Sequence, residues 1–282
     1  MDNFREDIIT MDGLHWHVVT AGDACNPPLL LLHCWTGNWR MWQRTMELLS
    51  PHFYCIAPDQ LGFGESDKPS GDFYRIPDQA RRARDILAHY GIERAIVVGH
   101  SMGGQIALTL AALEPQRIER LIVVDPPISG RLHWRLLTLT PLLELVGSGI
   151  EAPLQRVVER GTARPELVAP LMTVFFARPF EHLADVAYWS KQIIADGQIR
   201  SSYWAYRAIR AWDLRPHLRR IHAPLLAIWG MRDWTVDLHE CDTLEAGVRG
   251  CHVVRIAGCG HFPMIEAWDR YAHEVRRFLG VG

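Results

Sequence analysis

The 282-residue sequence lacks the features that mark secretion, membrane insertion or nucleic-acid binding. It contains no run of about 18 apolar residues, so we predict no membrane span. Its start, Met1–Asp7, does not show the positive, then apolar, then small-residue order of a signal peptide. The charges are mixed along the chain and sum to −2, without a basic stripe or a charged tail. We therefore expect a cytoplasmic protein with neither a nucleic acid nor a membrane as its partner.

Metal and cofactor signatures are also missing. The six cysteines form no CxxC pair and no metal-ligand spacing. Several fall in apolar runs, where a free cysteine behaves as a small hydrophobic residue. The sequence has no P-loop and no dinucleotide-binding glycine pattern. We expect no metal ion and no cofactor, and a small apolar or aromatic molecule as the partner, with a homodimer left open.

The sequence does contain short apolar runs that alternate with amphipathic helical patterns. Continuous apolarity, rather than alternation, is typical of parallel strands that are covered on both faces. Phe4–Val19 predicts two further strands joined at Met11–Gly13. The pattern predicts an α/β fold with a doubly wound, mostly parallel, eight-stranded sheet. The six later strands are predicted at Pro28–Leu32, Phe53–Ala57, Ile96–Val98, Leu121–Val124, Leu225–Trp229 and Val253–Ile256.

Between Asp125 and Pro224 the alternation of strand and helix patterns is interrupted. About a hundred residues show helical patterns but no convincing strand, which predicts a helical cap (127–212) inserted after the sixth strand of a core domain (1–126 and 213–282). Such an insertion would lie over the crevice where parallel sheets bind ligands; the alternative is a helical excursion packed beside the sheet. The predicted helices are Trp134–Leu145, Leu154–Arg160, Glu166–Phe176, His182–Ala195 and Tyr203–Trp212.

One stretch, Gly99-His100-Ser101-Met102-Gly103, predicts a sharp turn between a strand and a helix with a serine at its apex. Glycines two residues before and after the serine let the two limbs approach without Cβ clashes. The Ser101 hydroxyl would then be exposed at the end of the sheet. This is the pattern of a nucleophile elbow.

A serine nucleophile needs a base and an orienting acid. His261 is our candidate base, because it lies on a glycine-rich loop after the last strand. Asp233 is the candidate acid, since it follows the Leu225–Trp229 strand directly. Asp125 is an alternative acid, because it also closes a parallel strand at the same edge of the sheet.

Backbone N–H groups must also stabilise the oxyanion. That of Met102 lies at a helix N-terminus, and that of Trp35 lies in the loop after the first parallel strand, so both are candidates. His33 and His100 are interpreted as structural residues hydrogen-bonded beneath these loops. Aromatic residues are frequent near the predicted site, and we expect Trp35, Phe176, Trp189 and Trp234 to contact an apolar substrate.

Five motifs together resemble the α/β-hydrolase fold superfamily, in the branch of small esterases, lactonases and meta-cleavage-product hydrolases. The resemblance spans nearly all of the chain except the cap, and Cys34 departs from it where the family usually has glycine. It implies acyl transfer: Ser101 attacks a carbonyl, His261 takes the proton, and water releases the acyl group. The motifs are His33–Gly37, Asp59–Ser66, Gly99–Gly104, Gly230–Asp233 and Gly260–Phe262.

Two other functions compete with ester, lactone or thioester hydrolysis. The family also contains cofactor-independent 2,4-dioxygenases that cleave 3-hydroxy-4-oxoquinoline rings through a His–Asp pair, with the aspartate at the position of Asp125 and a tryptophan like Trp35. A non-enzymatic receptor or scaffold is the other alternative. Serine rather than aspartate at position 101 argues against a dehalogenase or an epoxide hydrolase.

Overall fold

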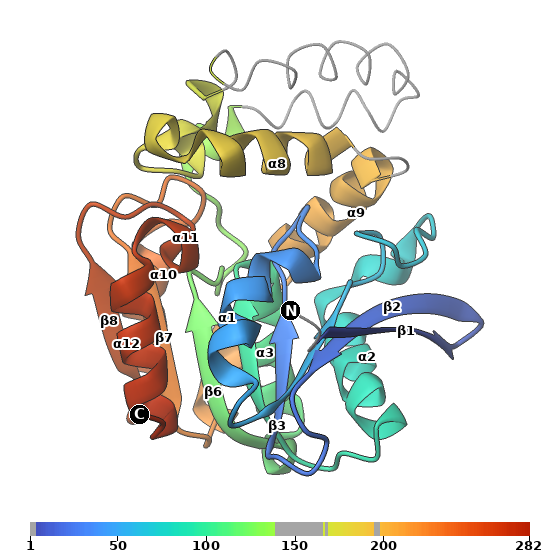
Figure 1. Ribbon diagram of the computed structural model, residues 1–282. Helices are drawn as coiled ribbons and strands as arrows, with labels where there is room; N and C mark the ends of the chain where they lie inside the picture. The colour runs from blue at the N-terminus through green and yellow to red at the C-terminus, as the bar shows by residue number, and fades with distance from the viewer. Residues whose placement is uncertain (1–3, 139–165, 167–168, 195–197) are drawn as a thin grey trace.

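The computed structural model describes residues 4–138, 166, 169–194 and 198–282, and its centre is one eight-stranded sheet (Figure 1). The strand order is β1-β2-β4-β3-β5-β6-β7-β8; β1 and β2 are antiparallel, β2 and β4 are antiparallel, and the remaining neighbours are parallel. The predicted sheet is confirmed. The strands are β1 (Phe4–Met11), β2 (Leu14–Ala21), β3 (Pro28–Leu32), β4 (Tyr54–Pro58), β5 (Ala95–His100), β6 (Ile118–Val124), β7 (Leu225–Gly230) and β8 (His252–Ile256).

Helices cover both faces of the sheet, so the central strands are mostly apolar and buried. One core contains Leu30 and Leu32 and packs against α2 (Ile76–His89), α3 (Met102–Leu113) and α10 (His239–Gly247). The other core contains the alternate residues Leu29 and Leu31. It packs against α1 (Gln43–Leu49) and α12 (Trp268–Leu279). This two-sided burial explains why the strands are continuous apolar runs in the sequence.

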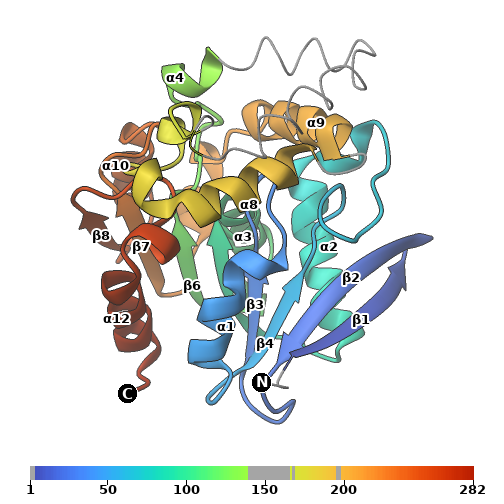
Figure 2. The same cartoon turned by 45° about the horizontal axis from the view of Figure 1, so that its top comes forward.

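Between β6 and β7, the described elements are helical, and α4 and α8 lie beyond the ends of the parallel strands (Figures 1 and 2). Figure 2 shows α8 crossing above the strands, between α4 and α9. No helix among the described residues is long and apolar enough to cross a membrane. The division into core and cap domains remains a prediction. The elements are α4 (Trp134–Leu137), η4 (Leu171–Val174), η5 (Pro179–His182), α8 (Leu183–Ile194), α9 (Gln198–Ala211) and η6 (Arg215–Arg220).

Three of the helices expected in this region differ from the structure or lie partly or wholly outside the described residues. The prediction of one helix over Glu166–Phe176 agrees with the structure at Glu166, which is helical, but is wrong over 169–176, which holds a turn and the short 3₁₀ helix η4. The physical reason is Pro170, whose ring would clash with the carbonyl four residues earlier inside an α-helix. The predicted helix Leu154–Arg160 lies outside the described residues, as does most of Trp134–Leu145.

Candidate active site

Ser101 lies at the apex of a tight turn between β5 and α3. Its backbone has φ 52° and ψ −117°, a strained conformation for a residue with a side chain, and its N–H donates to the carbonyl of Val124 at 2.8 Å. The turn requires glycine on both sides. A Cβ built on Gly99 would stand 2.3 Å from the carbonyl oxygen of Gly103, and one on Gly103 would stand 2.1 Å from that of Leu32.

Replacing Gly103 by alanine is expected to destabilise the fold strongly. At an ordinary helix position this change stabilises by about 1 kcal/mol. Here the new methyl group would press on the backbone of β3, and we expect a loss of about 3 kcal/mol in the free energy of unfolding, measured in urea. Gly91→Ala is the control: φ is +71° but the space is open, so only conformational strain of about 1–2 kcal/mol should appear. Equal losses in the two variants would contradict the steric explanation.

His261 is held against Asp233. Its Nδ1 lies 2.7 Å from Asp233 Oδ2, and both side chains are buried. The other carboxylate oxygen of Asp233 accepts from the N–H groups of Thr235 (2.7 Å) and Val236 (3.1 Å). Because an ionised carboxylate only accepts hydrogen bonds, Nδ1 of His261 carries the proton and its Nε2 is left with a free lone pair. A histidine oriented in this way can act as a general base.

Asp125, the alternative acid, is not hydrogen-bonded to His261 in the described part of the chain. Its Oδ1 accepts from the N–H of Gly230 at 2.9 Å, and its side chain is fully buried. Its backbone has φ 45°, another positive value for a residue that is not glycine. Burial first, and then the neighbouring Asp233, raise the pKa of the Asp125 carboxyl well above its ordinary value.

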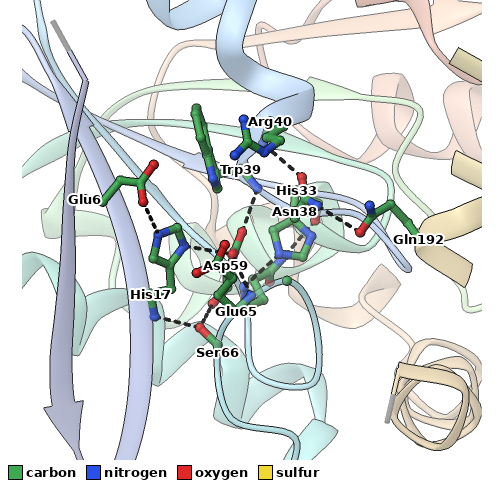
Figure 3. A network of polar contacts seen from close by, with 12 residues as sticks. Glu6, His17, His33, Asn38, Trp39, Arg40, Asp59, Glu65, Ser66 and Gln192 are labelled. Atoms are coloured by element: carbon green, nitrogen blue, oxygen red, sulfur yellow. Dashed lines mark hydrogen bonds and ion pairs between the residues drawn. The ribbon is translucent and has the colours of Figure 1, made fainter. Parts of the chain in front are cut away.

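The loop that follows β3 carries Trp35, the candidate oxyanion donor, and a buried polar network holds this loop in place (Figure 3). Asp59 Oδ1 accepts from the N–H of Trp39 at 2.7 Å. Asp59 Oδ2 accepts from the N–H of Glu65 and bonds Nδ1 of His17, each at 2.9 Å. Asp59 therefore joins the loop after β4 to the loop after β3, and the hydrogen bond to Asp59 raises the pKa of His17.

The two histidines interpreted as structural are both buried and hydrogen-bonded. His33 Nδ1 donates to the Cys34 carbonyl at 2.8 Å, and its Nε2 accepts from the N–H of Gln60 at 2.7 Å. His100 Nε2 lies 2.6 Å from the carbonyl oxygen of His261 and donates to it. Burial lowers the pKa of both imidazoles, so both are neutral.

Helices α8 and α9 are hydrogen-bonded directly to the loop after β3. Asn38 Nδ2 donates to Gln192 Oε1 of α8 at 3.0 Å. In α9, Gln198 donates to the carbonyl of Thr36 at 3.0 Å, and the Ser202 carbonyl accepts from the indole of Trp35 at 2.9 Å. These bonds fix where the helical segment lies over the site.

A cavity between this loop and the helical segment brings Ser101 and His261 together with Trp35 and Trp189. The other described residues that line the cavity are mostly apolar, as expected for a site that binds an apolar ligand. The remaining lining residues are Cys34, Thr36, Met172, Phe175, Thr235 and Phe262.

The other two aromatic residues expected at the substrate do not line this cavity. Phe176 is fully buried and its ring stacks 5.0 Å from that of Phe262, so it packs the interior while Phe175 faces the cavity. Trp234 follows Asp233 but turns away from it. Its ring lies 4.2 Å from the guanidinium of Arg135, outside the cavity.

The sequence did not indicate a role for Glu266, which belongs to none of the motifs. In the structure its carboxylate holds the loop that carries His261. Its Oε1 accepts from the N–H of Gly260 at 3.0 Å, and its Oε2 accepts from the N–H of Ala177 at 2.8 Å. The N–H of His261 also donates to the carbonyl of Phe175 at 2.7 Å. Burial raises the pKa of Glu266 to about 7. The only sequence signal is one carboxylate inside the apolar stretch 262–268.

Within the described residues, one group of three side chains could approach a metal ion: His100, Asp125 and His261, whose ligand atoms lie within 4.8 Å of one another. His261 Nδ1 is already bonded to Asp233, and His100 Nε2 donates to a carbonyl. The hydrogen bonds thus occupy one nitrogen of each imidazole, and the arrangement fits a proton-transfer site better than a metal centre.

Comparison with known proteins gives a consistent family assignment. The sequence pattern of the alpha/beta hydrolase fold matches residues 27–267. Lipase 1 of Psychrobacter immobilis is 28% identical over 268 residues, covering 92% of this chain and 79% of the lipase. A crystal structure described as a membrane phospholipase A is 26% identical, with a TM-score of 0.78, covering 99% of this chain and 86% of that one. An esterase from Rhodococcus sp. ECU1013 shares the fold at 22% identity, with a TM-score of 0.82 and coverage of 99% and 98%.

Proposed function

Because this chain belongs to the alpha/beta hydrolase fold family and is an enzyme of hydrolase type, we propose that it is a serine hydrolase of carboxylic esters, lactones or thioesters. Ser101, His261 and Asp233 are its triad. The observation that carries the proposal is the 2.7 Å hydrogen bond between His261 and Asp233, in a cavity that His261 shares with Ser101. A histidine oriented by a buried carboxylate beside a serine is the arrangement that acyl transfer needs.

In the proposed reaction, Nε2 of His261 takes the proton of Ser101 as Oγ attacks the substrate carbonyl. The N–H groups of Met102 and Trp35 stabilise the oxyanion, and the first of these lies at the N-terminus of α3, where negative charge is favoured. His261 then gives the proton to the leaving alcohol. Water, deprotonated by His261, attacks the acyl-enzyme, and the acid is released with Ser101 restored.

The character of the cavity supports a medium-sized, largely apolar substrate. Trp35, Phe175, Trp189 and Phe262 present aromatic surface, and Met172 adds a flexible apolar side chain. Such surfaces bind apolar groups by burying them from water, with the few polar groups fixing orientation. Lipases and esterases among the relatives agree with this substrate class.

The alternative is a cofactor-independent dioxygenase of a 3-hydroxy-4-oxoquinoline. In that reaction a histidine paired with an aspartate after the sixth strand deprotonates the substrate. Here the hydrogen bond joins His261 to Asp233 after the seventh strand, while Asp125 bonds Gly230. The contact therefore favours hydrolysis.

A substrate panel with an activity probe tests the proposal. We expect a fluorophosphonate to label the protein stoichiometrically at Ser101, as mapped by mass spectrometry of the peptides. We expect p-nitrophenyl esters and lactones to be hydrolysed at the same rate with and without oxygen. The quinolone arm should show neither oxygen uptake nor carbon monoxide release. Oxygen-dependent ring cleavage without labelling of Ser101 would overturn the proposal in favour of dioxygenation.

A further inference from the structure

Behind His261, two aspartates stand side by side at the ends of neighbouring strands. Asp125 follows β6 and Asp233 lies three residues after β7, the neighbouring parallel strand; a carboxylate oxygen of Asp125 lies within 4.8 Å of a ring nitrogen of His261, the histidine that Asp233 bonds. Both side chains are buried from solvent. Asp125 Oδ2 accepts no N–H or hydroxyl hydrogen bond from the described residues. A buried polar atom without a partner calls for an explanation.

The charges around this pair do not support two ionised carboxylates. The titratable groups facing it are His261 and Cys259 from the loop after β8, His100 at the end of β5, His133 before α4, Cys241 of α10 and Glu266 of α11 (Pro263–Glu266). His100 is neutral, since burial lowers its pKa well below the ordinary value. Within the described residues, no arginine or lysine pairs with either aspartate. Two buried like charges without a counter-ion are so unfavourable that the pair keeps a proton.

The hydrogen bonds indicate which aspartate keeps it. Asp233 accepts from three N–H groups, two of the backbone and one of His261. Asp125 accepts from one, that of Gly230. Hydrogen bonds from donors favour the charged form of a carboxyl group. The negative charge therefore belongs on Asp233, and the proton belongs on Asp125.

We propose that Asp125 is a positioning residue, whose neutral carboxyl group donates its proton to the Asp233 carboxylate and holds that carboxylate against His261. The unpartnered Oδ2 is then the oxygen that carries the proton. This inference rests on the proposed function, because it takes Asp233 as the acid of the triad. It adds a fourth member behind the triad, one that never touches substrate and stays protonated throughout the reaction.

The arrangement has a consequence for the pH dependence of turnover. A hydrogen bond from Asp125 withdraws charge from Asp233, which therefore stabilises the protonated form of His261 less strongly. Without that hydrogen bond, Asp233 keeps more of its negative charge and stabilises the protonated form of His261 more strongly. The acidic limb of the kcat/KM profile, where the base becomes protonated, then moves to higher pH.

Two substitutions of Asp125 distinguish loss of its hydrogen-bond donor from loss of the whole side chain. Asp125→Asn keeps a donor toward Asp233 and an acceptor toward Gly230. Asp125→Gly removes both and tolerates the backbone φ of +45° without strain. We expect the acidic limb of Asp125→Asn to coincide with that of the natural protein. We expect the limb of Asp125→Gly to move up by about one pH unit, with a lower kcat.

Infrared spectroscopy in D₂O at neutral pH tests the proton directly and needs no substrate. The difference spectrum of the natural protein minus Asp125→Asn should contain the carbonyl band of a protonated carboxylic acid, because Glu266 contributes equally to both. Absence of that band would overturn the inference, whether or not Asp125→Gly folds. So would an Asp125→Asn variant as impaired as Asp233→Asn. An ester panel without turnover would instead overturn the proposed function and leave the infrared result standing.

Discussion

Ser101→Ala loses ester turnover by about 10⁶-fold and is no longer labelled by a fluorophosphonate. This is the expected size of the loss, because removal of the nucleophile of a serine protease costs about that much in kcat. The substitution removes one hydroxyl and leaves the backbone conformation equally strained, since serine and alanine both carry a Cβ at φ 52°. Steady-state hydrolysis of a p-nitrophenyl ester and gel detection of the probe measure the two effects.

Ser190→Ala is the matched control for this variant. Ser190 is also buried, in α8, and its hydroxyl has no hydrogen-bond partner among the described residues. The control should keep both turnover and labelling. Undiminished turnover by Ser101→Ala would remove the acyl-enzyme from the mechanism and leave His261 to act on the substrate directly.

Asp233→Asn is expected to lower kcat by about 10⁴-fold, as the same change does in the triad of a serine protease. The reason lies in the tautomer of His261. An asparagine amide facing Nδ1 donates a proton to it, so Nε2 carries the hydrogen and cannot accept the proton of Ser101. The oxygen that accepts from Thr235 and Val236 is preserved in asparagine, so the loop keeps its shape.

The control for Asp233→Asn lies in the same loop. Among the described residues, the side chain of Asp237 accepts one hydrogen bond, from the N–H of His239 at 3.0 Å, and Asp237→Asn should leave turnover unchanged. Asp125→Asn is the third variant. The kcat values of Asp233→Asn, Asp237→Asn and Asp125→Asn are compared by stopped-flow or steady-state kinetics. If Asp125→Asn lost 10⁴-fold and Asp233→Asn lost little, the two aspartates would exchange roles.

The sheet and the turn at Ser101 could be predicted from sequence because their causes are local. A strand covered on both faces must be apolar throughout, as β3 and β7 are. The turn requires glycine at positions 99 and 103, because backbone oxygens lie where side chains would stand. The meeting of His261 and Asp233 follows from topology: both lie on loops after neighbouring parallel strands, β8 and β7.

What the sequence did not predict depends on packing between distant segments. Nothing in the local pattern distinguishes Phe175, at the cavity, from Phe176, stacked on Phe262. The role of Glu266 depends on Ala177, almost ninety residues earlier, passing beside Gly260. The protonation of Asp125 depends on complete burial beside a second carboxylate. None of these can be read from spacing or composition.

The hydrogen bonds between the loop after β3 and the two overlying helices have a consequence for engineering. Asn38 bonds α8, and Thr36 and Trp35 bond α9, so the helical segment and the loop share one set of contacts. Transplanting that segment from another hydrolase would therefore also change the support of Trp35. A chimera designed to accept a new substrate therefore also needs residues 35–38 from the hydrolase that supplied the helical segment. Without them, we expect it to bind the new ester but to turn it over slowly.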